Sequence, residues 1–546
     1  MNLPTRKPLT IALILLGCVI VGLGLGNFLV WVTNVGEKEL RLTVCTTTDL
    51  HGAYFEENYD GSHNPSSLAR VSTALQELRA QGENPILIDV GDNLQGDNAA
   101  YYYNYVDTLS EHVFATMARD LNYDAIIVGN HDIEAGHPVY DRLKESHKAP
   151  LLAANAVISE GNRAGEPYFI PYTIVRREGL DIAIIGMTNA NIKAWLTEEK
   201  WKGIDFRQIS VVAQSWVNRV RKKERPALVI LAVHSGVGKG DWPDIENEGL
   251  WLARKLKGVD LVLCGHDHRP RTELITHRDG SETFLIDAGS KALMLGVAQF
   301  SLTKKWSHLK AHTCEVRLED LRDVEPDEAF VERYAPQFEA VRAYALRPVG
   351  KLTKPLSFED ALQGPSAYMS LIHRAQLYYS QADVSISAPL ASQGFLPAGP
   401  VSFLDLTRIY KFENLLYTVE LTGAQLKGYL EYSYDHWVRR DGPSYNYDSA
   451  AGIRYTVNRS ADYGHRVRIL SMENGRPFNP QATYRVAMTS YRASGAGNLL
   501  SEGAGVNPDS LKITAMYKDI RSLIGDYLSQ SGPYTPTADA NWSFIR

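Results

Sequence analysis

Five apolar runs in the first half of the chain each end in side chains that can bind a metal ion. Runs that are apolar on both faces are typical of interior strands in covered sheets, and such sheets carry their sites beyond the carboxyl ends of the strands. The pattern therefore predicts an α/β fold in which one sheet edge collects these side chains. The runs are LTVCTTTDLH, ILIDVGD, AIIVGNH, LVILAVH and LVLCGHDH, and the side chains are Asp49, His51, Asp92, Asn130, His234, His266 and His268.

The number of these side chains predicts two metal ions. One catalytic ion usually keeps about three protein ligands and an open position, which would leave several of the candidates unused. Asp92 is the expected bridge between two ions, because it is offered singly from the middle of the set and a carboxylate has two oxygens to share. Taken alone, Asp49 could cap a helix and His234 could be an ordinary buried histidine. Their joint occurrence with the other candidates favours a metal centre.

A centre of two ions indicates hydrolysis of a phosphoester. Ions about 3.5–4 Å apart can hold a hydroxide nucleophile and bind the non-bridging oxygens of the phosphate. Asn130 suits such a centre because a neutral amide leaves more of the metal charge for the substrate. His131 is expected to point the other way, toward the leaving group or a phosphate oxygen, and to act there as a cation or an acid. Asp132 and Glu134 both qualify as the acid that orients His131, and spacing does not choose between them.

The amino-terminal segment predicts a membrane anchor. Arg6 and Lys7 precede an uncharged apolar stretch, Leu9–Val32, and a spanning helix needs roughly 17–25 such residues. Basic residues before the stretch favour a cytoplasmic amino terminus. A cleaved signal peptide is the alternative, although its apolar region is usually only about 7–15 residues. In either case we expect everything after about Gly36 to lie outside the cytoplasmic membrane, in the periplasm or on the cell surface.

Composition narrows the partners further. The net charge of −6 provides no basic footprint for a nucleic-acid backbone, so a long nucleic acid is not an expected partner. We expect a monomer. Beyond Cys18 the cysteines are Cys45, Cys264 and Cys314, an odd number without a CxxC pair, which argues against a disulfide framework or a structural zinc site. Cys45 and Cys264 lie inside apolar runs and are expected to be small buried core residues.

The length of 546 residues predicts roughly two to four structural units. Alternating apolar and amphipathic stretches, the latter including 66–80 and 211–223, give way after Leu318 to a charged segment of helical pattern, Glu325–Arg347, bounded by Pro326 and Pro348. After it a second region of mixed α/β type begins, with helical stretches predicted at 366–381 and 422–433 and strands at 453–457 and 483–489. The predicted units are an anchor or signal segment over 1–36, an α/β domain over 37–322, a linker helix over 323–349 and a second α/β domain over 350–546.

The metal-binding pattern resembles the calcineurin-like metallophosphatases of the 5′-nucleotidase family. The D-x-H, GD-x-x, GNH, H and GHxH blocks of that family occur here in order, as Asp49–His51, Gly91–Asp92, Gly129–His131, His234 and Gly265–His268. The resemblance implies a four-layer αββα fold of two packed sheets flanked by helices, and two divalent ions, which could be Mn, Zn, Co or Mg. It implies one ion held by Asp49, His51, Asp92 and His268 and the other by Asp92, Asn130, His234 and His266.

The second half of the chain looks like the substrate-binding domain of the same family. The segments IYKFENLLYTVELTGAQLKGYLE (409–431) and YRVAMTSYRASGAGNLL (484–500) carry the resemblance. It implies that Phe412 and Tyr491 sandwich a nucleobase and that Asn414 contacts the base. Stacking of this kind is worth about 1–3 kcal/mol per base. Read alone, either aromatic residue could belong to the core.

Three segments look more like one branch of the family, the 2′,3′-cyclic-nucleotide 2′-phosphodiesterase/3′-nucleotidases: GDNLQGD (91–97), YNYDSAAGIRYTV (445–457) and SYRASGAG (490–497). The 5′-nucleotidase branch usually has a Gly-rich segment ending in Arg where this chain reads SAPLASQG (387–394), and that arginine is missing. We therefore expect hydrolysis of 2′,3′-cyclic nucleotides and 3′-nucleotides to nucleoside and phosphate. A 5′-nucleotidase or UDP-sugar hydrolase is the alternative of the same chemical class. A surface-tethered nucleotide-binding protein without catalysis is the alternative of another class.

Overall fold

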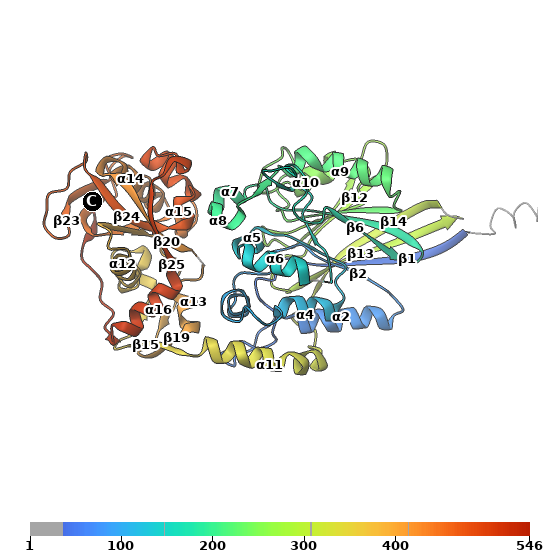
Figure 1. The fold of residues 1–546 in the computed structure, drawn as a ribbon, viewed down its shortest axis with the longest axis horizontal. Coiled ribbons are helices and arrows are strands. Elements are labelled where there is room, and N and C mark those ends of the chain that lie inside the picture. The colour runs from blue at the N-terminus through green and yellow to red at the C-terminus, as the bar shows by residue number, and fades with distance from the viewer. Residues whose placement is uncertain (1–36, 147, 306–307, 413) are drawn as a thin grey trace, which may run out of the picture.

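The computed structural model describes residues 37–146, 148–305, 308–412 and 414–546. They form two domains, connected along one edge by the long helix α11 (Glu328–Ala345) (Figure 1). The predicted anchor over 9–32 lies outside the described residues. Within the described ranges, no helix is both long and apolar enough to cross a membrane.

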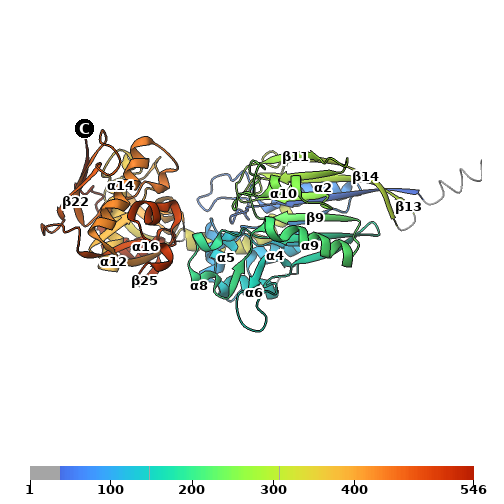
Figure 2. The same cartoon turned by 90° about the horizontal axis from the view of Figure 1, so that it is seen from above.

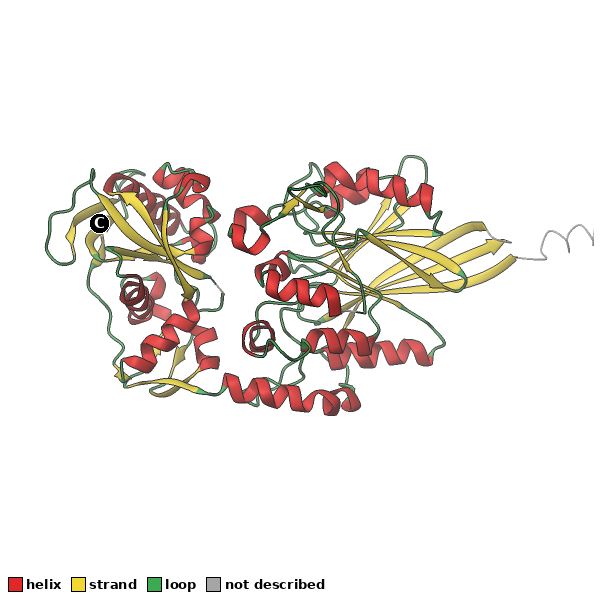
Figure 3. Ribbon diagram, in the orientation of Figure 1, coloured by secondary structure: helices red, strands yellow, loops and turns green. Residues whose placement is uncertain are grey.

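The first domain consists of four layers, in agreement with the expected αββα arrangement. Two six-stranded sheets pack face to face, and helices cover the outer face of each (Figure 3). The first sheet has the order β14 (His308–Asp320), β13 (Met294–Lys305), β1 (Glu37–Thr47), β2 (Ile86–Asp89), β3 (Ala125–Ile127), β4 (Leu151–Leu152). The second has the order β11 (Arg271–Thr276), β12 (Glu282–Asp287), β10 (Leu261–Cys264), β9 (Leu228–Val233), β7 (Leu180–Met187), β6 (Tyr172–Arg177).

Three buried apolar clusters separate the four layers. Residues such as Val44 and Ile230 fill the space between the sheets. The outer clusters lie under α2 (Leu68–Ala80) and α4 (Val113–Leu121) on the first sheet, and under α9 (Ile209–Lys223) and α10 (Gly249–Lys255) on the second. The central strands are therefore buried on both faces, which explains why the sequence shows continuous apolar runs rather than alternation. Cys45 and Cys264 are at most 1% exposed, as expected for core positions.

The direction of the central strands decides where the ligands gather. Strands β1 to β4 are mutually parallel, and so are β7, β9, β10 and β12. From the amino-terminal side of the molecule, β1 runs toward the second domain in both views (Figures 1 and 2). The loops that leave the carboxyl ends of these strands consequently face the second domain.

The second domain is built on a mixed five-stranded sheet. Its order is β21 (Ser449–Ala451), β17 (Val384–Ser387), β24 (Thr483–Thr489), β20 (Leu415–Thr422), β25 (Ile513–Asp519), and its main helices are α12 (Ala367–Ser380), α14 (Gly423–Arg439) and α16 (Ile520–Gln530). Helix α14 extends beyond the predicted helical stretch 422–433. Thr422 and Gln425 start it with a reciprocal capping box, in which each side chain accepts the backbone N–H of the other.

Smaller sheets complete the second domain. One contains β19 (Gly399–Ser402), β15 (Pro348–Leu352) and β26 (Pro533–Tyr534), and another contains β23 (Val467–Met472), β22 (Ile453–Asn458) and β27 (Trp542–Ile545). Helix α13 (Phe403–Ile409) follows β19. Helix α11, which lies inside the predicted linker range, contacts both domains. Its Phe338 ring packs against Phe55 of the first domain, and its Tyr344 ring packs against Phe403 of the second.

Candidate metal centre and nucleotide cleft

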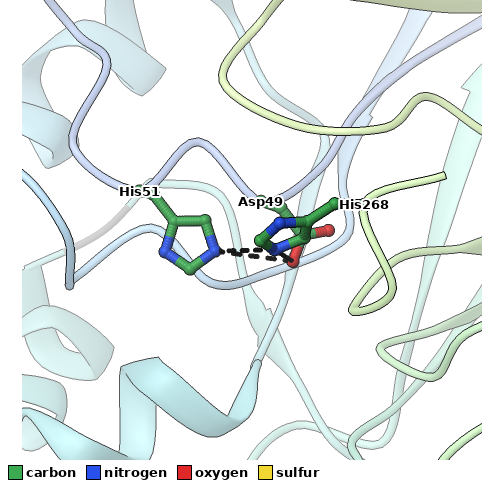
Figure 4. A group of neighbouring side chains, drawn as sticks. All are labelled: Asp49, His51 and His268. Carbon is green, nitrogen blue, oxygen red and sulfur yellow. Dashed lines mark hydrogen bonds and ion pairs between the residues drawn. The ribbon is translucent and has the colours of Figure 1, made fainter. Parts of the chain in front are cut away.

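The loops after the parallel strands bring the predicted ligands together in two groups. Asp49, His51 and His268 form one group, with ligand atoms that all lie within 4.8 Å of one another. Figure 4 shows these three side chains converging on one point. The second group, with the same spacing, is Asp92, His234 and His266. Each group therefore combines one carboxylate with two imidazoles, a donor set that suits a divalent transition metal.

In the first group a buried oxygen is left without a hydrogen bond. Oδ1 of Asp49 accepts none from the described residues, although Nε2 of His268 lies 3.3 Å away. The other oxygen, Oδ2, accepts hydrogen bonds from Thr48 Oγ1 at 2.5 Å and from the backbone N–H of His266 at 2.9 Å. The Nε2 atoms of His51 and His268 lie 3.0 Å apart. An unsatisfied carboxylate oxygen that faces two ring nitrogens fits a bound cation.

In the second group Asn130 joins the carboxylate and the imidazoles. Its Oδ1 lies 3.1 Å from Nε2 of His234 and 2.9 Å from Nδ1 of His266. Nε2 of His234 also lies 3.1 Å from Oδ2 of Asp92. All seven predicted ligands are thus present at one edge of the two sheets.

Backbone carbonyls set the tautomers of two of the histidines. Nδ1 of His234 lies 2.7 Å from the carbonyl oxygen of Val90, and Nδ1 of His51 lies 3.1 Å from that of Gln95. A carbonyl oxygen accepts only a hydrogen bond, so each Nδ1 carries the proton. The lone pair of Nε2 is then available to a metal ion.

The backbone of the ligands is strained. Five of the seven predicted ligands have a positive φ, which L-residues adopt at a cost of roughly 1–2 kcal/mol each. Their φ angles are 50° at Asp49, 48° at His51, 58° at Asp92, 90° at His266 and 56° at His268. Strain of this kind persists where the surrounding structure imposes it, and it clusters at functional sites.

Two glycines permit the close approach of the ligand loops. A Cβ atom on Gly129 would lie 2.1 Å from Oδ1 of Asp92, and one on Gly265 would lie 2.1 Å from Oγ1 of Thr48. Both contacts are far below van der Waals distance. The glycine before Asn130 and the glycine before His266 are therefore needed because no side chain fits at either position.

The structure separates the two acids that the sequence left open beside His131. Nδ1 of His131 bonds to the carboxylate of Glu134. Asp132 instead accepts four backbone N–H groups at 2.8–3.1 Å, from Asp92, Asn93, Leu94 and Gly129. Asp132 thus ties together the two loops that carry Asp92 and Asn130, while Glu134 is the acid at the imidazole.

The charge of His131 follows from its neighbours. Burial alone would lower the pKa of its ring, but the carboxylates of Asp92 and Glu134 raise that pKa to about 9. The backbone N–H of His131 also donates a hydrogen bond of 2.7 Å to Oδ1 of Asp92. At neutral pH this arrangement favours a protonated imidazole next to the metal-binding groups.

A cleft between the two domains connects the sheet edge that carries the predicted metal ligands, here called the metal edge, with the predicted base-binding residues. Its volume is about 730 Å³. The first domain contributes Asn130, His131, Glu134 and His266 to its lining, and the second contributes Phe412, Asn414 and Tyr491. The other predicted ligands do not line it. The cleft consequently opens onto the Asn130 and His266 side of the centre, with the His131–Glu134 pair at its wall.

The sequence assigned no role to two further residues of the cleft. Arg492 is 3% exposed, and its Nε and Nη2 form a bidentate pair with Asp448 at 2.9 and 3.0 Å. The Trp195 ring stacks on His266, with centroids 5.3 Å apart and planes at 20°. The dipeptide Tyr491–Arg492 was visible in the sequence, but the partner of Arg492 lies 44 residues away, and only folding brings the two together.

Comparison with known proteins supports both halves of this arrangement. Residues 42–270 match the family model described as calcineurin-like phosphoesterase, and residues 348–502 match that described as 5′-nucleotidase, C-terminal domain. The chain is 25% identical to a 2′,3′-cyclic-nucleotide 2′-phosphodiesterase/3′-nucleotidase of Haemophilus influenzae, over 93% of this chain and 88% of that protein. It is 24% identical to a 5′-nucleotidase of Vibrio cholerae, over 84% of this chain and 86% of that protein.

Solved structures show the same fold over most of the chain. A Staphylococcus aureus protein in complex with alpha-ketoglutarate superimposes with a TM-score of 0.76 at 20% identity, covering 93% of this chain and 100% of that chain. A 5′-nucleotidase precursor from Thermus thermophilus gives a TM-score of 0.65 at 21% identity, with the same coverage. These similarities concern the whole two-domain arrangement and not one domain alone.

Proposed function

Given that the chain is a calcineurin-like phosphoesterase with a 5′-nucleotidase C-terminal domain, we propose that it hydrolyses 2′,3′-cyclic nucleotides and 3′-nucleotides to nucleoside and phosphate. The observation that carries the proposal is that His131 and Asn130 of the first domain and Phe412 and Tyr491 of the second line one and the same cleft. A nucleotide that fills it can place its phosphate at the metal edge while its base lies between the aromatic rings.

The metal edge would hold two divalent ions. Asp49, His51, Asp92 and His268 are the proposed ligands of one, and Asp92, Asn130, His234 and His266 those of the other, with Mn, Zn, Co or Mg as the candidate metals. Two such ions activate a water molecule and neutralise charge on the phosphate. The unsatisfied oxygen of Asp49 and the positive φ angles of the ligands support this assignment.

His131 has a separate role in the proposal. Glu134 bonds to Nδ1, so the remaining N–H, at Nε2, is available to an oxygen of the substrate. There it would stabilise charge that develops on the phosphate or protonate the leaving oxygen of the ribose. Glu134 would orient the ring and keep it protonated.

The wall of the second domain supports the 3′ rather than the 5′ branch of the reaction. Ser387, Ala388 and Leu390 line the cleft, and all three are uncharged. They belong to the segment 387–394, where the 5′-nucleotidases usually have an arginine. A 5′-phosphate would therefore find no guanidinium partner from this segment.

The location of the reaction follows from the sequence and not from the described residues. We place the catalytic domains outside the cytoplasmic membrane, in the periplasm or on the cell surface, with Leu9–Val32 as the anchor. Protease added to intact spheroplasts should then degrade the chain after about Gly36. Full protection of the chain would contradict this topology.

The proposed function is tested with the purified full-length chain in detergent. With Mn²⁺ present, 2′,3′-cAMP, 3′-AMP and 5′-AMP are assayed in parallel, and released adenosine and phosphate are followed. We expect turnover of the first two, abolished by Asn130→Ala and by His131→Ala. Turnover of 5′-AMP alone would move the assignment to a 5′-nucleotidase. Inactivity on all three with Mn²⁺, Co²⁺ or Zn²⁺ would favour a nucleotide-binding protein without catalysis.

A further inference from the structure

The cleft wall contains few cationic side chains. Among its described lining residues, Lys200 and Arg492 are the only lysine or arginine. Arg492 directs all five of its N–H groups at protein acceptors: the carboxylate of Asp448, the side chain of Asn446, and the backbone carbonyls of Tyr445 and Ala496. Its hydrogen-bonding capacity is therefore used within the domain, and, apart from His131 at the metal edge, Lys200 is the cation of the described lining that is left for a ligand.

Lys200 lies on the metal side of the cleft, next to the His131–Glu134 pair. It is carried by the short helix α8 (Glu198–Trp201), which packs against α5 (Asn130–Glu134) and lies at the end of the first domain that faces the second (Figures 1 and 2). Its Nζ lies 3.6 Å from the position that a Cβ atom on Gly136 would occupy. Tyr140 Oη donates a hydrogen bond of 2.9 Å to the carbonyl oxygen of Lys200, which fixes the helix to the first domain.

The protein itself provides only weak partners for this ammonium group. In the part of the chain that the structure describes, no carboxylate forms an ion pair with Lys200, and the nearby Glu134 is bonded to His131. The ring of Tyr105 lies 6.0 Å from Nζ, which is the outer limit of a cation–π contact. A half-buried lysine without an ion pair at the wall of a binding cleft is suited to an anion of the ligand, because charge-assisted hydrogen bonds are among the strong ones.

The segment just before Lys200 lines the cleft and contacts the second domain. Trp195 and Thr197 line the same wall, and the carbonyl oxygen of Trp195 accepts a hydrogen bond of 3.3 Å from Ser494 of the second domain. We infer that a nucleotide with its phosphate at the metal edge and its base at Phe412 would lie with its ribose along this wall. A volume of about 730 Å³ is in the upper part of the usual range for ligand sites, about 300–1,000 Å³, and leaves room for a further substituent on the ribose.

We propose that Lys200 binds a second phosphate of the substrate, so that the cleft accepts nucleoside 3′,5′-bisphosphates in preference to 3′-monophosphates. The inference rests on the proposed function, since it assumes that a nucleotide spans the cleft with its 3′-phosphate at the metal edge. The 5′-phosphate then lies against the ammonium group of α8.

Equilibrium binding to the full-length chain tests the proposal without turnover. All chains are loaded with Mn²⁺ and carry His131→Ala, which is expected to abolish turnover, and the chain with Lys200 intact in this background is the wild type of the comparison. The dissociation constants of adenosine 3′,5′-bisphosphate and 3′-AMP, which differ only in the 5′-phosphate, are measured by calorimetry. We expect the wild type to bind the bisphosphate about tenfold more tightly, since one charge-assisted contact is worth about 1.4 kcal/mol or more. K200Q and K200M should both lose this preference, and K200R should keep it.

Lys193→Gln is the matched control. Lys193 belongs to the neighbouring helix α7 (Ile192–Trp195), pairs with Asp205 at 2.6 Å and does not line the cleft. K193Q should retain the preference of the wild type. Equal affinity of the wild type for both ligands, or an unchanged preference in K200Q and K200M, would overturn the proposal. Failure of the proposed function would be detected in a separate measurement, in which the metal-loaded enzyme would not turn over 2′,3′-cAMP.

Discussion

The two walls of the cleft are held in place by different kinds of interaction. We call the first-domain side, which carries the predicted metal ligands, the metal wall, and the second-domain side, which includes Phe412 and Tyr491, the nucleotide wall. The metal wall is made of short motifs that follow parallel strands, and its side chains are positioned by left-handed backbone and by backbone hydrogen bonds. The nucleotide wall combines side chains from segments far apart in the sequence, such as Phe412, Asn446 and Arg492, and a side-chain hydrogen bond joins the last two. The first wall depends on backbone geometry and the second on tertiary packing. Substitutions in the two walls should therefore differ in their effects on turnover, metal content, substrate binding and stability.

The largest effect is expected at the proposed bridge of the metal wall. Asp92→Asn removes a charge that both ions would share, and we expect kcat for 2′,3′-cAMP to fall about 10³-fold, since the loss of one electrostatic stabiliser costs about 10²–10³-fold. Bound metal, measured by mass spectrometry, should fall as well. The control is Asp279→Asn, at an exposed turn that does not line the cleft. A loss of less than tenfold with full metal content would remove Asp92 from the centre.

The stability of the second domain, which forms the nucleotide wall, should depend on pH through a buried histidine. His373 is buried, and its ring nitrogens bond to Ser385 of β17 and Ser449 of β21 at 2.9 and 3.1 Å. Burial lowers the pKa of His373 to about 4. As the pH falls below about 6.5 the unfolded chain takes up the proton first, so the stabilisation is complete above about pH 6.5 and is lost down to about pH 4.

The measurement is urea unfolding at pH 7.5 and pH 5. Linkage gives a loss of about 2 kcal/mol from this histidine at pH 5. In His373→Gln this contribution disappears, so the variant should lose about 2 kcal/mol less than the wild type between the two pH values. An identical pH dependence of the two proteins would show that His373 takes up its proton equally in the folded and unfolded states.

The two acids next to His131 should separate kinetics from stability. We expect Glu134→Gln to lower kcat about 10–100-fold with an unchanged melting temperature, because it removes the group that orients the imidazole. We expect Asp132→Asn to lower the free energy of unfolding by about 2 kcal/mol, because the charged acceptor of four N–H groups is lost. Thermal melts and steady-state kinetics on both variants check the assignment. The reverse pattern would make Asp132 the partner of the histidine.

The smallest effect is expected at the aromatic pair of the nucleotide wall. Phe412→Ala should raise KM for 2′,3′-cAMP about tenfold, since stacking on a base is worth about 1–3 kcal/mol. The ratio to turnover of p-nitrophenyl phosphate, which has no nucleobase, isolates base binding from chemistry. Phe395→Ala provides the control, since Phe395 is 54% exposed and does not line the cleft. Equal losses on both substrates would show that Phe412 supports the fold and not the base.

Much of the architecture could be predicted from local patterns. The apolar runs predict the central strands, and the amphipathic stretches at 66–80 and 211–223 correspond to α2 and α9. In the second domain the predicted strand over 483–489 is β24. The ends of the elements were predicted less accurately. Helix α14 continues to Arg439, beyond the predicted end at 433, because its end depends on packing within the domain.

The sequence by itself determined the metal wall, because a ligand that directly follows a buried parallel strand lies at the carboxyl edge that these strands share. It also determined the nature of the second domain through the segments around Phe412 and Tyr491. Only the tertiary structure decided between Glu134 and Asp132, revealed the partner of Arg492 and brought Lys200 to the cleft. Each of these outcomes depends on whether groups distant in the sequence form hydrogen bonds or ion pairs with a polar side chain. Spacing along the chain carries no information about such contacts.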